Sequence, residues 1–442
     1  MRRGPRTRPA RRGAKHATPS ITLQEHLGAA DAEFAQDASA TTSRLSAKAR
    51  WVEFSTSNGA TRRWPSAQAL ASVFGVTDGI LVHQQIRALI EAGALTSTPA
   101  IAPTQIQPAS LDLRLSTRGY RVRSGFLPEN CRVADRLEEM TLYPFDLTDG
   151  AVLEKGHCYI IPLLERIEKP LEYLIRANPK SSTGRLDLFT RVLADHCGRF
   201  ETVPPGYTGP LYLEIVPRSF PVRVRTGLSL SQIRFSSGQA SLTDDELRAE
   251  HERAPLLFDD TGAPLPTDQL RLDDGLMMGI ATMRDQDIQG SIGYVARRYT
   301  SVLDMSEENG HDMDAFFQPI EAPRDGRLIV EPEEFYIFAS KERVRIPPHL
   351  AAEMVAYDVG IGELRTNYAG FFDNGFGGER GTRAVLEVRP HDVPFLLEDG
   401  QVFFKLDFFR TQEAPEVVYG DQRLSSHYQG QALKLSKHFR AV

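Results

Sequence analysis

Short runs of alternating apolar and polar residues fill most of the chain after residue 103. Leu111, Leu113 and Leu115 alternate with polar neighbours, and a period of two is typical of a β-strand that buries one face. Gly and Pro turns separate the similar runs, which are residues 152–162, 209–217, 222–224 and 228–235. This pattern predicts a mainly β protein with many short strands.

Helical patterns are confined to short segments. Residues 84–94 carry apolar side chains at helical spacing, and Gly93 marks the expected end of that helix. Thr243 stands three residues before Glu246, which is the spacing of a capping box and predicts a short acidic helix. We also expect a small helical piece within residues 51–74.

The second half of the chain repeats the first. Residues 146–174 and 321–350 both contain an Asp-Gly turn, an aromatic strand, a Glu-Arg pair, and a Pro before a Leu. Residues 209–235 and 382–408 match in order and spacing within a few positions. Self-similarity over such lengths indicates two copies of one β-domain.

The repeat and the changes in composition divide the chain. We expect a basic, disordered extension over residues 1–75, a first β-domain over 76–235, an acidic connecting segment over 236–285, a second β-domain over 286–412 and a C-terminal tail over 413–442. The extension has seven Arg and Lys residues before its first acid, so contact with a polyanion is its alternative interpretation. No apolar stretch follows these basic residues, which argues against a secretory signal.

Bulk composition excludes several classes of protein. The 442-residue chain has a formal net charge of −6, which offers no general argument for nucleic-acid binding. No stretch approaches the roughly 18 apolar residues of a membrane span, so we expect no membrane partner. Cys131, Cys158 and Cys197 are far apart and odd in number, which favours a reducing cytoplasm over a disulfide framework. The chain lacks the Cys-x-x-Cys element of zinc deaminases, so we expect no zinc.

Four segments together resemble the dCTP deaminases of the dUTPase-like superfamily. They are residues 106–115 (Ile-Gln-Pro-Ala-Ser-Leu-Asp-Leu-Arg-Leu), 180–185 (Lys-Ser-Ser-Thr-Gly-Arg), 205–214 (Pro-Gly-Tyr-Thr-Gly-Pro-Leu-Tyr-Leu-Glu) and 426–431 (Ser-His-Tyr-Gln-Gly-Gln). Their order is that of the family, and the repeat resembles its long, two-copy form. The resemblance implies two tandem dUTPase-like distorted, jelly-roll-like β-barrels with a few short helices. It also implies metal-independent deamination of dCTP to dUTP and ammonia, which supplies dUTP for thymidylate synthesis.

The resemblance implies roles for the first-copy motifs. Lys180, Ser181 and Ser182 lie in the expected phosphate loop, and Arg185 is expected to orient the attacking water. Mg²⁺ is expected on the triphosphate of the nucleotide rather than in a protein cage. Tyr207, on the hairpin that follows, is a candidate substrate-binding residue.

Deamination at C4 of cytosine needs a group that takes a proton from water and passes protons to the ring and the leaving amine. A carboxylate can do so when burial brings its pKa near neutrality. The resemblance points to the glutamate of the strand after the hairpin, which is Glu214 in the first copy and Glu387 in the second.

The two copies have lost different motifs. At the phosphate-loop position the second copy reads Ala-Tyr-Asp-Val-Gly (356–360), yet its hairpin keeps Asp373 and Phe376. Because the family builds each site between neighbouring subunits, we predict a hybrid site that pairs the first phosphate loop with the second hairpin. Glu387 would then transfer the protons, and Glu214 remains the alternative.

The C-terminal tail resembles the family segment that closes over bound nucleotide. Tyr428 and Gln431 are expected near the base or phosphates, and Tyr419 is a weaker candidate. His427 stands where the single-copy bacterial enzymes usually carry Lys, which puts one phosphate contact in doubt. We do not expect Gln232 or its repeat partner Lys405 to act directly.

Three alternatives remain open from the sequence. A dUTP diphosphatase of the same fold could use Asp373 to activate water, and a bifunctional enzyme could do both reactions. A non-catalytic nucleotide-binding regulator would keep the phosphate loop and tail without the chemistry. For assembly we favour a homotrimer, because closed symmetry is usual for oligomers, with a fused monomer as the alternative.

Overall fold

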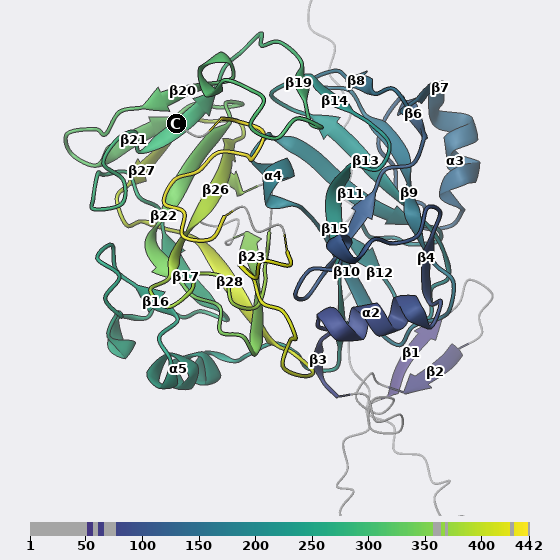
Figure 1. The fold of residues 1–442 in the computed structure, drawn as a ribbon, viewed down its shortest axis with the longest axis horizontal. Coiled ribbons are helices and arrows are strands. Elements are labelled where there is room, and N and C mark those ends of the chain that lie inside the picture. Colours follow the sequence, from purple (N-terminus) through teal and green to yellow (C-terminus); the bar gives the residue numbers. More distant parts are fainter. Residues whose placement is uncertain are drawn as a thin grey trace, which may run out of the picture. The chain divides into compact units, whose positions relative to one another are not determined.

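The computed structural model describes residues 51–55, 61–65, 77–356, 364–366, 370–424 and 428–440. Strands dominate these residues (Figure 1), which confirms the predicted mainly β class. The helices are short. They are α2 (His83–Glu91), α3 (Val133–Met140), α4 (Ser181–Gly184) and α5 (Asp244–Arg253), with the 3-10 turns η1 (Pro103–Gln105), η2 (Thr267–Gln269) and η3 (Met313–Ala315).

The first half of the chain forms two main sheets. One runs β11 (Leu188–Ala194), β13 (Gly209–Pro217), β9 (Tyr159–Ile167), β6 (Arg118–Val122) and β7 (Thr141–Asp146), with β4 (Leu95–Ser97) also on β9. The other runs β12 (Thr202–Val203), β10 (Leu174–Pro179), β15 (Ser229–Ser237) and β3 (Gly79–Ile80), with β5 (Leu111–Arg114) also on β15. A third, smaller sheet pairs β8 (Ala151–Leu153) with β14 (Val222–Val224).

The second half repeats this arrangement. Its larger sheet runs β20 (Phe317–Ile320), β18 (Gly293–Ala296), β22 (Tyr336–Val344), β26 (Thr382–Pro390) and β24 (Leu364–Thr366), with β16 (Leu257–Phe258) also on β22. A second sheet runs β17 (Leu276–Gly279), β28 (Val402–Arg410), β23 (Leu350–Ala356) and β25 (Phe371–Phe372), and β21 (Arg327–Val330) pairs with β27 (Phe395–Glu398). The central pair β22–β26 corresponds to β9–β13, as the sequence repeat predicts.

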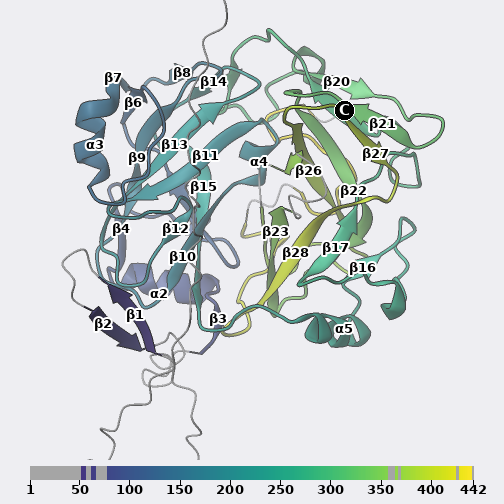
Figure 2. The same cartoon turned by 180° about the vertical axis from the view of Figure 1, so that it is seen from behind.

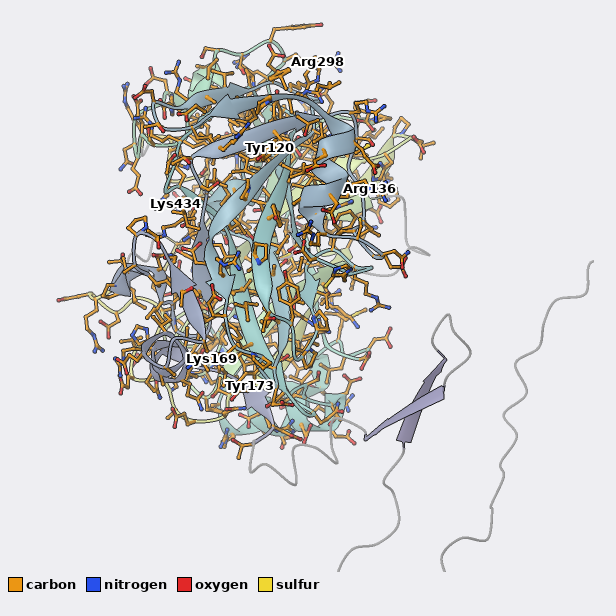
Figure 3. The ribbon with its side chains drawn as sticks, turned by 90° about the vertical axis from the view of Figure 1, so that its right-hand side faces the viewer. Tyr120, Arg136, Lys169, Tyr173, Arg298 and Lys434 are labelled. Atoms are coloured by element: carbon orange, nitrogen blue, oxygen red, sulfur yellow. The ribbon has the colours of Figure 1, made fainter. Side chains whose placement is uncertain are left out.

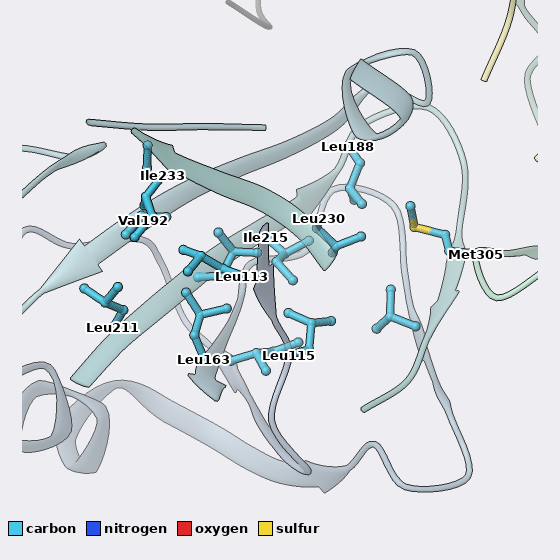
Figure 4. Close-up of a cluster of buried hydrophobic side chains, with 14 of the residues drawn as sticks. Leu113, Leu115, Leu163, Leu188, Val192, Leu211, Ile215, Leu230, Ile233 and Met305 are labelled. Atoms are coloured by element: carbon cyan, nitrogen blue, oxygen red, sulfur yellow. The ribbon is translucent and has the colours of Figure 1, made fainter. Parts of the chain in front are cut away.

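The alternating leucines of β5 point into the core of the first half. Leu111, Leu113 and Leu115 are fully buried, and Figure 4 shows Leu113 and Leu115 among the apolar side chains of the facing strands. Met305, from the second half, joins the same cluster. The period of two therefore identified the side chains that face the apolar core, although Asp112 between them is buried as well.

Local boundaries differ from the expectations in instructive ways. The run 152–162 is two strands, because the chain turns at Gly156, whose φ of +76° is easy only for glycine. The helix expected over 84–94 ends at Glu91, two residues before Gly93, which has a φ of +66°. The acidic helix is α5, and Thr243 caps it by accepting a hydrogen bond from the Glu246 amide.

Two segments carry strands that the sequence interpretation did not assign. Within the expected connecting segment 236–285, β16 and β17 pair with strands of the second half. Within 51–74, where a helical piece was expected, residues 51–55 and 61–65 instead form β1 (Trp51–Ser55) and β2 (Thr61–Pro65), which pair antiparallel, and residues 66–74 lie outside the described residues. The aromatic and β-branched residues of the two strands favour extended backbone. Residues 1–50, the larger part of the basic extension, lie outside the described residues.

The two halves share a buried interface. Phe220 of the first half packs edge-on against Phe316 and Phe317, with ring centroids 5.4 and 5.3 Å apart. The short strand β19 (Leu303–Asp304) adds in parallel to β14. Figures 1 and 2 both place α4 between β11 of the first half and β26 of the second. Residues from both halves can therefore meet beside α4.

Candidate active site

The expected phosphate loop is a single helical turn at the end of β10. The backbone amide of Lys180 and the hydroxyl of Thr183 both donate to the carbonyl oxygen of Leu230, at 3.0 and 2.9 Å. These two bonds fasten the turn to β15. The side chain of Lys180 pairs with the buried carboxylate of Asp112.

Strand β26 carries Glu387 into the interface between the halves. Every residue of β26 is buried, so Glu387 has no outward face to occupy. The hairpin that carries Asp373 and Phe376 lies nearby, and both of these residues are buried. Tyr368 and Ala369, at the start of the same predicted hairpin, lie outside the described residues.

An inner recess of about 50 Å³ collects side chains from both halves and from the tail. The first half contributes Pro179, Lys180, Ser181 and Arg185; the second contributes Met354, Gly370, Phe371, Phe372, Asp373, Phe376, Val385 and Glu387; the tail contributes Tyr419, Tyr428 and Gln431. The predicted pairing of the first phosphate loop with the second hairpin is therefore present within one chain.

The central contact of the recess joins Arg185 to Glu387. Nε of Arg185 lies 3.9 Å from Oε1 of Glu387, and the two side chains are 4% and 6% exposed. Burial raises the pKa of Glu387 to about 8, although the positive charge of Arg185 opposes that rise. A carboxyl with such a pKa exists in both protonation states near neutral pH, which is the property that proton transfer requires.

The tail holds Arg185 in place. Nη1 of Arg185 donates to Oε1 of Gln431 at 2.9 Å and to the carbonyl oxygen of Lys434 at 2.7 Å. The guanidinium also lies 3.9 Å from the ring centroid of Tyr428, within the range of a cation–π interaction. These contacts bring Tyr428 and Gln431 to the site as predicted, whereas His427 lies outside the described residues.

The tail also bridges the two halves. The side-chain amide of Gln431 donates to the carbonyl oxygen of Arg383 in β26 at 3.2 Å. The hydroxyl of Ser436 donates to the carbonyl oxygen of Ser182 in α4 at 2.8 Å. The tail segment between these residues therefore connects β26 of the second half with α4 of the first.

Sequence reasoning missed Arg234, which holds the second-half hairpin. Its Nη2 lies 3.0 Å from Oδ1 of Asp373, and its guanidinium lies 4.1 Å from the ring centroid of Phe371. Its Nη1 donates to the carbonyl oxygen of Ala352 at 2.9 Å. Burial raises the pKa of Asp373, and Arg234 opposes this rise. The available signal was a charged residue at a position of β15 flanked by buried Ile233 and Phe235.

Glu214 and Tyr207 lie elsewhere in the first half. Glu214 is buried beside Cys158, and burial raises the pKa of its carboxyl. The loop at Gly125 covers it so closely that a Cβ there would lie 2.3 Å from Oε2 of Glu214. The hydroxyl of Tyr207 donates to the carbonyl oxygen of Pro210 at 2.6 Å. Neither residue lines the inner recess.

An outer groove of about 380 Å³ adjoins the recess. The two cavities share Lys180, Ser181, Phe371, Asp373, Tyr419 and Tyr428. The groove adds Ser182, Gln232, Lys437 and His438 to its lining. Ligand pockets usually measure about 300–1,000 Å³, a range that includes the groove and exceeds the recess. Lys405, the repeat partner of Gln232, instead donates to the carbonyl oxygen of Asp274 at 2.8 Å.

Three negative findings apply to the described ranges. They contain no group of three or more His, Cys, Asp or Glu residues arranged to hold a metal ion. No helix among them is sufficiently long and apolar to cross a membrane. Cys131, Cys158 and Cys197, all within these ranges, are free thiols.

Comparison with family models accounts for most of the chain. The model of the 2'-deoxycytidine 5'-triphosphate deaminase N-terminal domain matches residues 77–239, and that of the C-terminal domain matches residues 243–439. The chain belongs to the dCTP deaminase family. The two matches also fit the internal repeat, since each half of the chain has its own model in this family.

Individual dCTP deaminases are similar over different lengths. The crystal structure of 2'-deoxycytidine 5'-triphosphate deaminase from Agrobacterium tumefaciens has 45% identity and a TM-score of 0.70, and the match covers 76% of this chain and 99% of that one. A dCTP deaminase from Natronomonas pharaonis is 29% identical over 163 residues, which are 36% of this chain and 80% of the relative. A dUMP-forming dCTP deaminase from Corynebacterium glutamicum strain R is 30% identical over 156 residues, which are 35% and 78%.

Proposed function

We propose that this chain hydrolyses dCTP to dUTP and ammonia in the inner recess, with Glu387 as the proton-transferring carboxylate. The observation that carries this proposal is the buried pair of Arg185 and Glu387, which come from opposite halves of the chain and lie 3.9 Å apart. Glu214 is the weaker candidate, because the loop at Gly125 covers its carboxylate and it lies outside the recess.

The chemistry needs one carboxyl group to handle two proton transfers. Glu387 removes a proton from water as the oxygen bonds to C4 of cytosine, and delivers that proton to N3. The remaining hydroxyl proton then passes through Glu387 to the exocyclic amine, the C4–N bond breaks, and ammonia leaves. A pKa of about 8 suits both steps, since neither the acid nor the base form is strongly disfavoured near neutral pH.

Arg185 supplies the donor that orients water in this proposal. Its Nε is buried and has no hydrogen-bond partner among the described residues. Its other contacts, to Gln431 and the Lys434 carbonyl, fix the direction of the guanidinium plane. A fixed donor stabilises the attacking oxygen without reorganisation during the reaction.

The remaining recess residues would bind the nucleotide. Lys180, Ser181 and Ser182 suit the phosphates, because an ammonium, hydroxyls and backbone amides are common phosphate donors. Mg²⁺ would arrive with the triphosphate as part of the substrate. Asp373 and Phe376 would lie beside the sugar and base, where Tyr428 and Gln431 close the recess.

The dUTP diphosphatase alternative depends on Asp373 as a water-activating base. That carboxylate is already paired with Arg234 at 3.0 Å, and the same guanidinium lies over the ring of Phe371. Pairing of this kind suits a residue that holds the sugar better than a free general base. Bifunctional dUMP formation stays an outcome of the test below.

The test is incubation of the purified protein with dCTP and Mg²⁺, followed by chromatography of the nucleotides and an ammonia assay. We expect dUTP and ammonia in equal amounts, with E387Q lowering the rate about 10²–10⁴-fold and the matched variant E214Q changing it little. dUMP with pyrophosphate would mean a bifunctional enzyme. Intact dCTP with hydrolysed dUTP would replace the proposal with a diphosphatase, and unchanged nucleotides would favour a binding protein.

The homotrimer remains a prediction of its own. Both halves of one chain complete the recess, so the proposed chemistry does not depend on the number of chains. Light scattering on the purified protein distinguishes three chain masses from one. A cytoplasmic location likewise stays a prediction.

A further inference from the structure

We propose that Lys437 binds the end of the triphosphate and makes this enzyme select dCTP over the diphosphate and monophosphate. The proposal rests on the proposed function, since it assigns the outer groove to the phosphates of the same nucleotide. It adds a residue from the last part of the tail, which no motif in the sequence indicated.

The fold directs Lys437 into the outer groove. Ser436, the preceding residue, donates its hydroxyl to the carbonyl oxygen of Ser182 at 2.8 Å. The backbone amide of Lys437 donates to the hydroxyl of Tyr428 at 3.3 Å. Anchored in this way, Lys437 lines the groove together with Lys180 and Ser181.

Lys437 is one of the two lysines that line the described part of this groove. Of the basic residues that line its described part, Arg114 is engaged by the buried carboxylate of Glu165 at 2.7 Å. Burial lowers the pKa of His438 to about 4, so its ring is neutral at physiological pH. Lys180 and Lys437 remain, one from the phosphate loop and one from the tail.

The two lysines are arranged in a similar way. Lys180 pairs with Asp112, and Nζ of Lys437 lies 2.5 Å from Oε1 of Glu308. Both ammonium groups act on Asp112, since each opposes the rise that burial causes in its pKa. Both lysines and both carboxylates line the same groove, so the ammonium groups face a common space where the carboxylates hold them until an anion enters. Each ammonium has three donors and can contact phosphate while keeping its carboxylate.

The position of Lys437 would make the affinity for a nucleotide depend on the number of its phosphates. The recess that holds Glu387 would take the base, and the residues shared with the groove would guide the phosphates outward. Because Lys437 comes from the tail, a triphosphate that reaches it joins the phosphate loop to the tail. A diphosphate or a monophosphate would not reach Lys437 and so would not join the phosphate loop to the tail.

The competing explanation is that Lys437 only fastens the tail through its ion pair with Glu308. The two explanations predict opposite effects for the partner residue. If the pair is structural, K437M and E308Q weaken all nucleotides alike. If Lys437 binds phosphate, E308Q releases it and leaves dCTP affinity equal or tighter.

The experiment is calorimetric titration of the full chain with dCTP, dCDP and dCMP in the presence of Mg²⁺, with E387Q in every variant and in the reference protein so that dCTP is not consumed. For K437M we expect dCTP affinity to fall about tenfold or more, as for loss of a charge-assisted hydrogen bond, with dCMP affinity unchanged. K437R should keep the preference for dCTP. The matched control is R440M, which removes another tail ion pair, Arg440 to Asp312 at 2.5 Å, outside the groove; it should bind like the reference protein.

Either of two results on folded variants would overturn the assignment of Lys437. One is unchanged dCTP affinity in K437M, and the other is an equal loss for all three nucleotides in K437M and E308Q. A reference protein that binds none of the nucleotides would overturn the proposed function as well. Binding of dCTP by the reference protein with an unaffected K437M would overturn the Lys437 assignment alone, so the two failures are distinguishable.

Discussion

At the scale of single residues, the recess depends on buried charges that are paired across the two halves. Glu387 has Arg185 as its cation, and Asp373 has Arg234. Burial raises the pKa of both carboxyl groups, because water no longer stabilises the charged form. Each cation comes from the half that lacks the carboxylate. Proper pairing therefore requires that both halves are folded and docked.

Glu387 should make the protein less stable as the pH rises. Its carboxyl has a pKa of about 8 when folded, against the ordinary value of 4.5. Between these values the unfolded chain releases a proton that the folded chain keeps, so the stabilising contribution is complete below about 4.5 and lost as the pH rises through about 8. E387Q cannot ionise. We expect its advantage in melting temperature over the wild type to grow from pH 5 to pH 9.

Thermal melting of both proteins at several pH values checks this expectation. E214Q provides a second comparison, because burial raises the pKa of Glu214 as well. Glu214 lies outside the recess, so its variant should change stability with pH while leaving dCTP turnover nearly unchanged. A melting difference for E387Q that does not vary with pH would contradict the assigned pKa.

At the scale of secondary-structure elements, short strands and helices with well-defined ends position the recess residues. α4 follows β10 directly, which directs Arg185 towards the second half. α5 begins at a complete capping box, in which Thr243 accepts from the Glu246 amide and the Glu246 carboxylate accepts from the Thr243 amide at 2.9 Å. The helix is part of the second half, but its residues do not line the recess.

T243A should cost about 1 kcal/mol of stability, because it removes the side-chain acceptor of the α5 N-cap. Urea unfolding measures this change, and dCTP turnover should remain that of the wild type. T117A is a matched control, since Thr117 is exposed and outside any helix; its effect should stay within about 0.5 kcal/mol. Equal effects for the two variants would show that the capping bond contributes nothing.

At the scale of the whole molecule, the two halves act as one structure. The buried ion pair of Asp187 and Arg389 crosses between them, and the hydroxyl of Ser219 donates to Asp187 at 2.6 Å. The surface, by contrast, carries charged side chains, and Figure 3 shows Arg136, Arg298 and Lys434 among them. Surface charges of this kind contribute little to stability. The buried pair is the better test of how the halves depend on each other.

D187N should destabilise the chain by about 3–5 kcal/mol, because the buried guanidinium of Arg389 loses its buried anion and keeps only the exposed carboxylate of Glu333 at 3.7 Å. Asparagine suits this position, whose φ of +54° it tolerates. Urea unfolding is the measurement, and E398Q is the control. That variant breaks the exposed pair of Arg327 and Glu398 and should cost at most about 1 kcal/mol. A similar small loss for D187N would mean that the halves do not rely on this contact.

Much of the fold was predictable because it follows from local patterns. β13 and β14 begin and end where the alternation of apolar residues predicted, and the Thr243 capping box predicted α5. The run 152–162 was harder to divide, because its apolar residues continue through the turn at Gly156. β1 and β2 were not predicted, since residues 51–65 show no clear period, although their aromatic and β-branched residues favour strands.

The site was predictable only in part. Lys180, Ser181 and Arg185 belong to a contiguous motif, so their proximity follows from the sequence. The complementary loss of motifs between the copies predicted that Asp373 and Phe376 would meet this loop, and the structure brings these residues together. Whether they act as proposed stays a prediction. Arg234 was missed because nothing in a strand of alternating residues indicates a partner 139 positions away.

By itself, the sequence determined the short strands, the two-copy repeat and the residue types available for chemistry, since periodicity and motifs are local properties. Only the tertiary structure decided which glutamate faces a cation across the interface. Glu214 and Glu387 occupy equivalent strands, yet the loop at Gly125 covers one and Arg185 lies beside the other. That difference arises from the docking of the two halves. Docking depends on contacts between residues far apart in the chain, which no local pattern records.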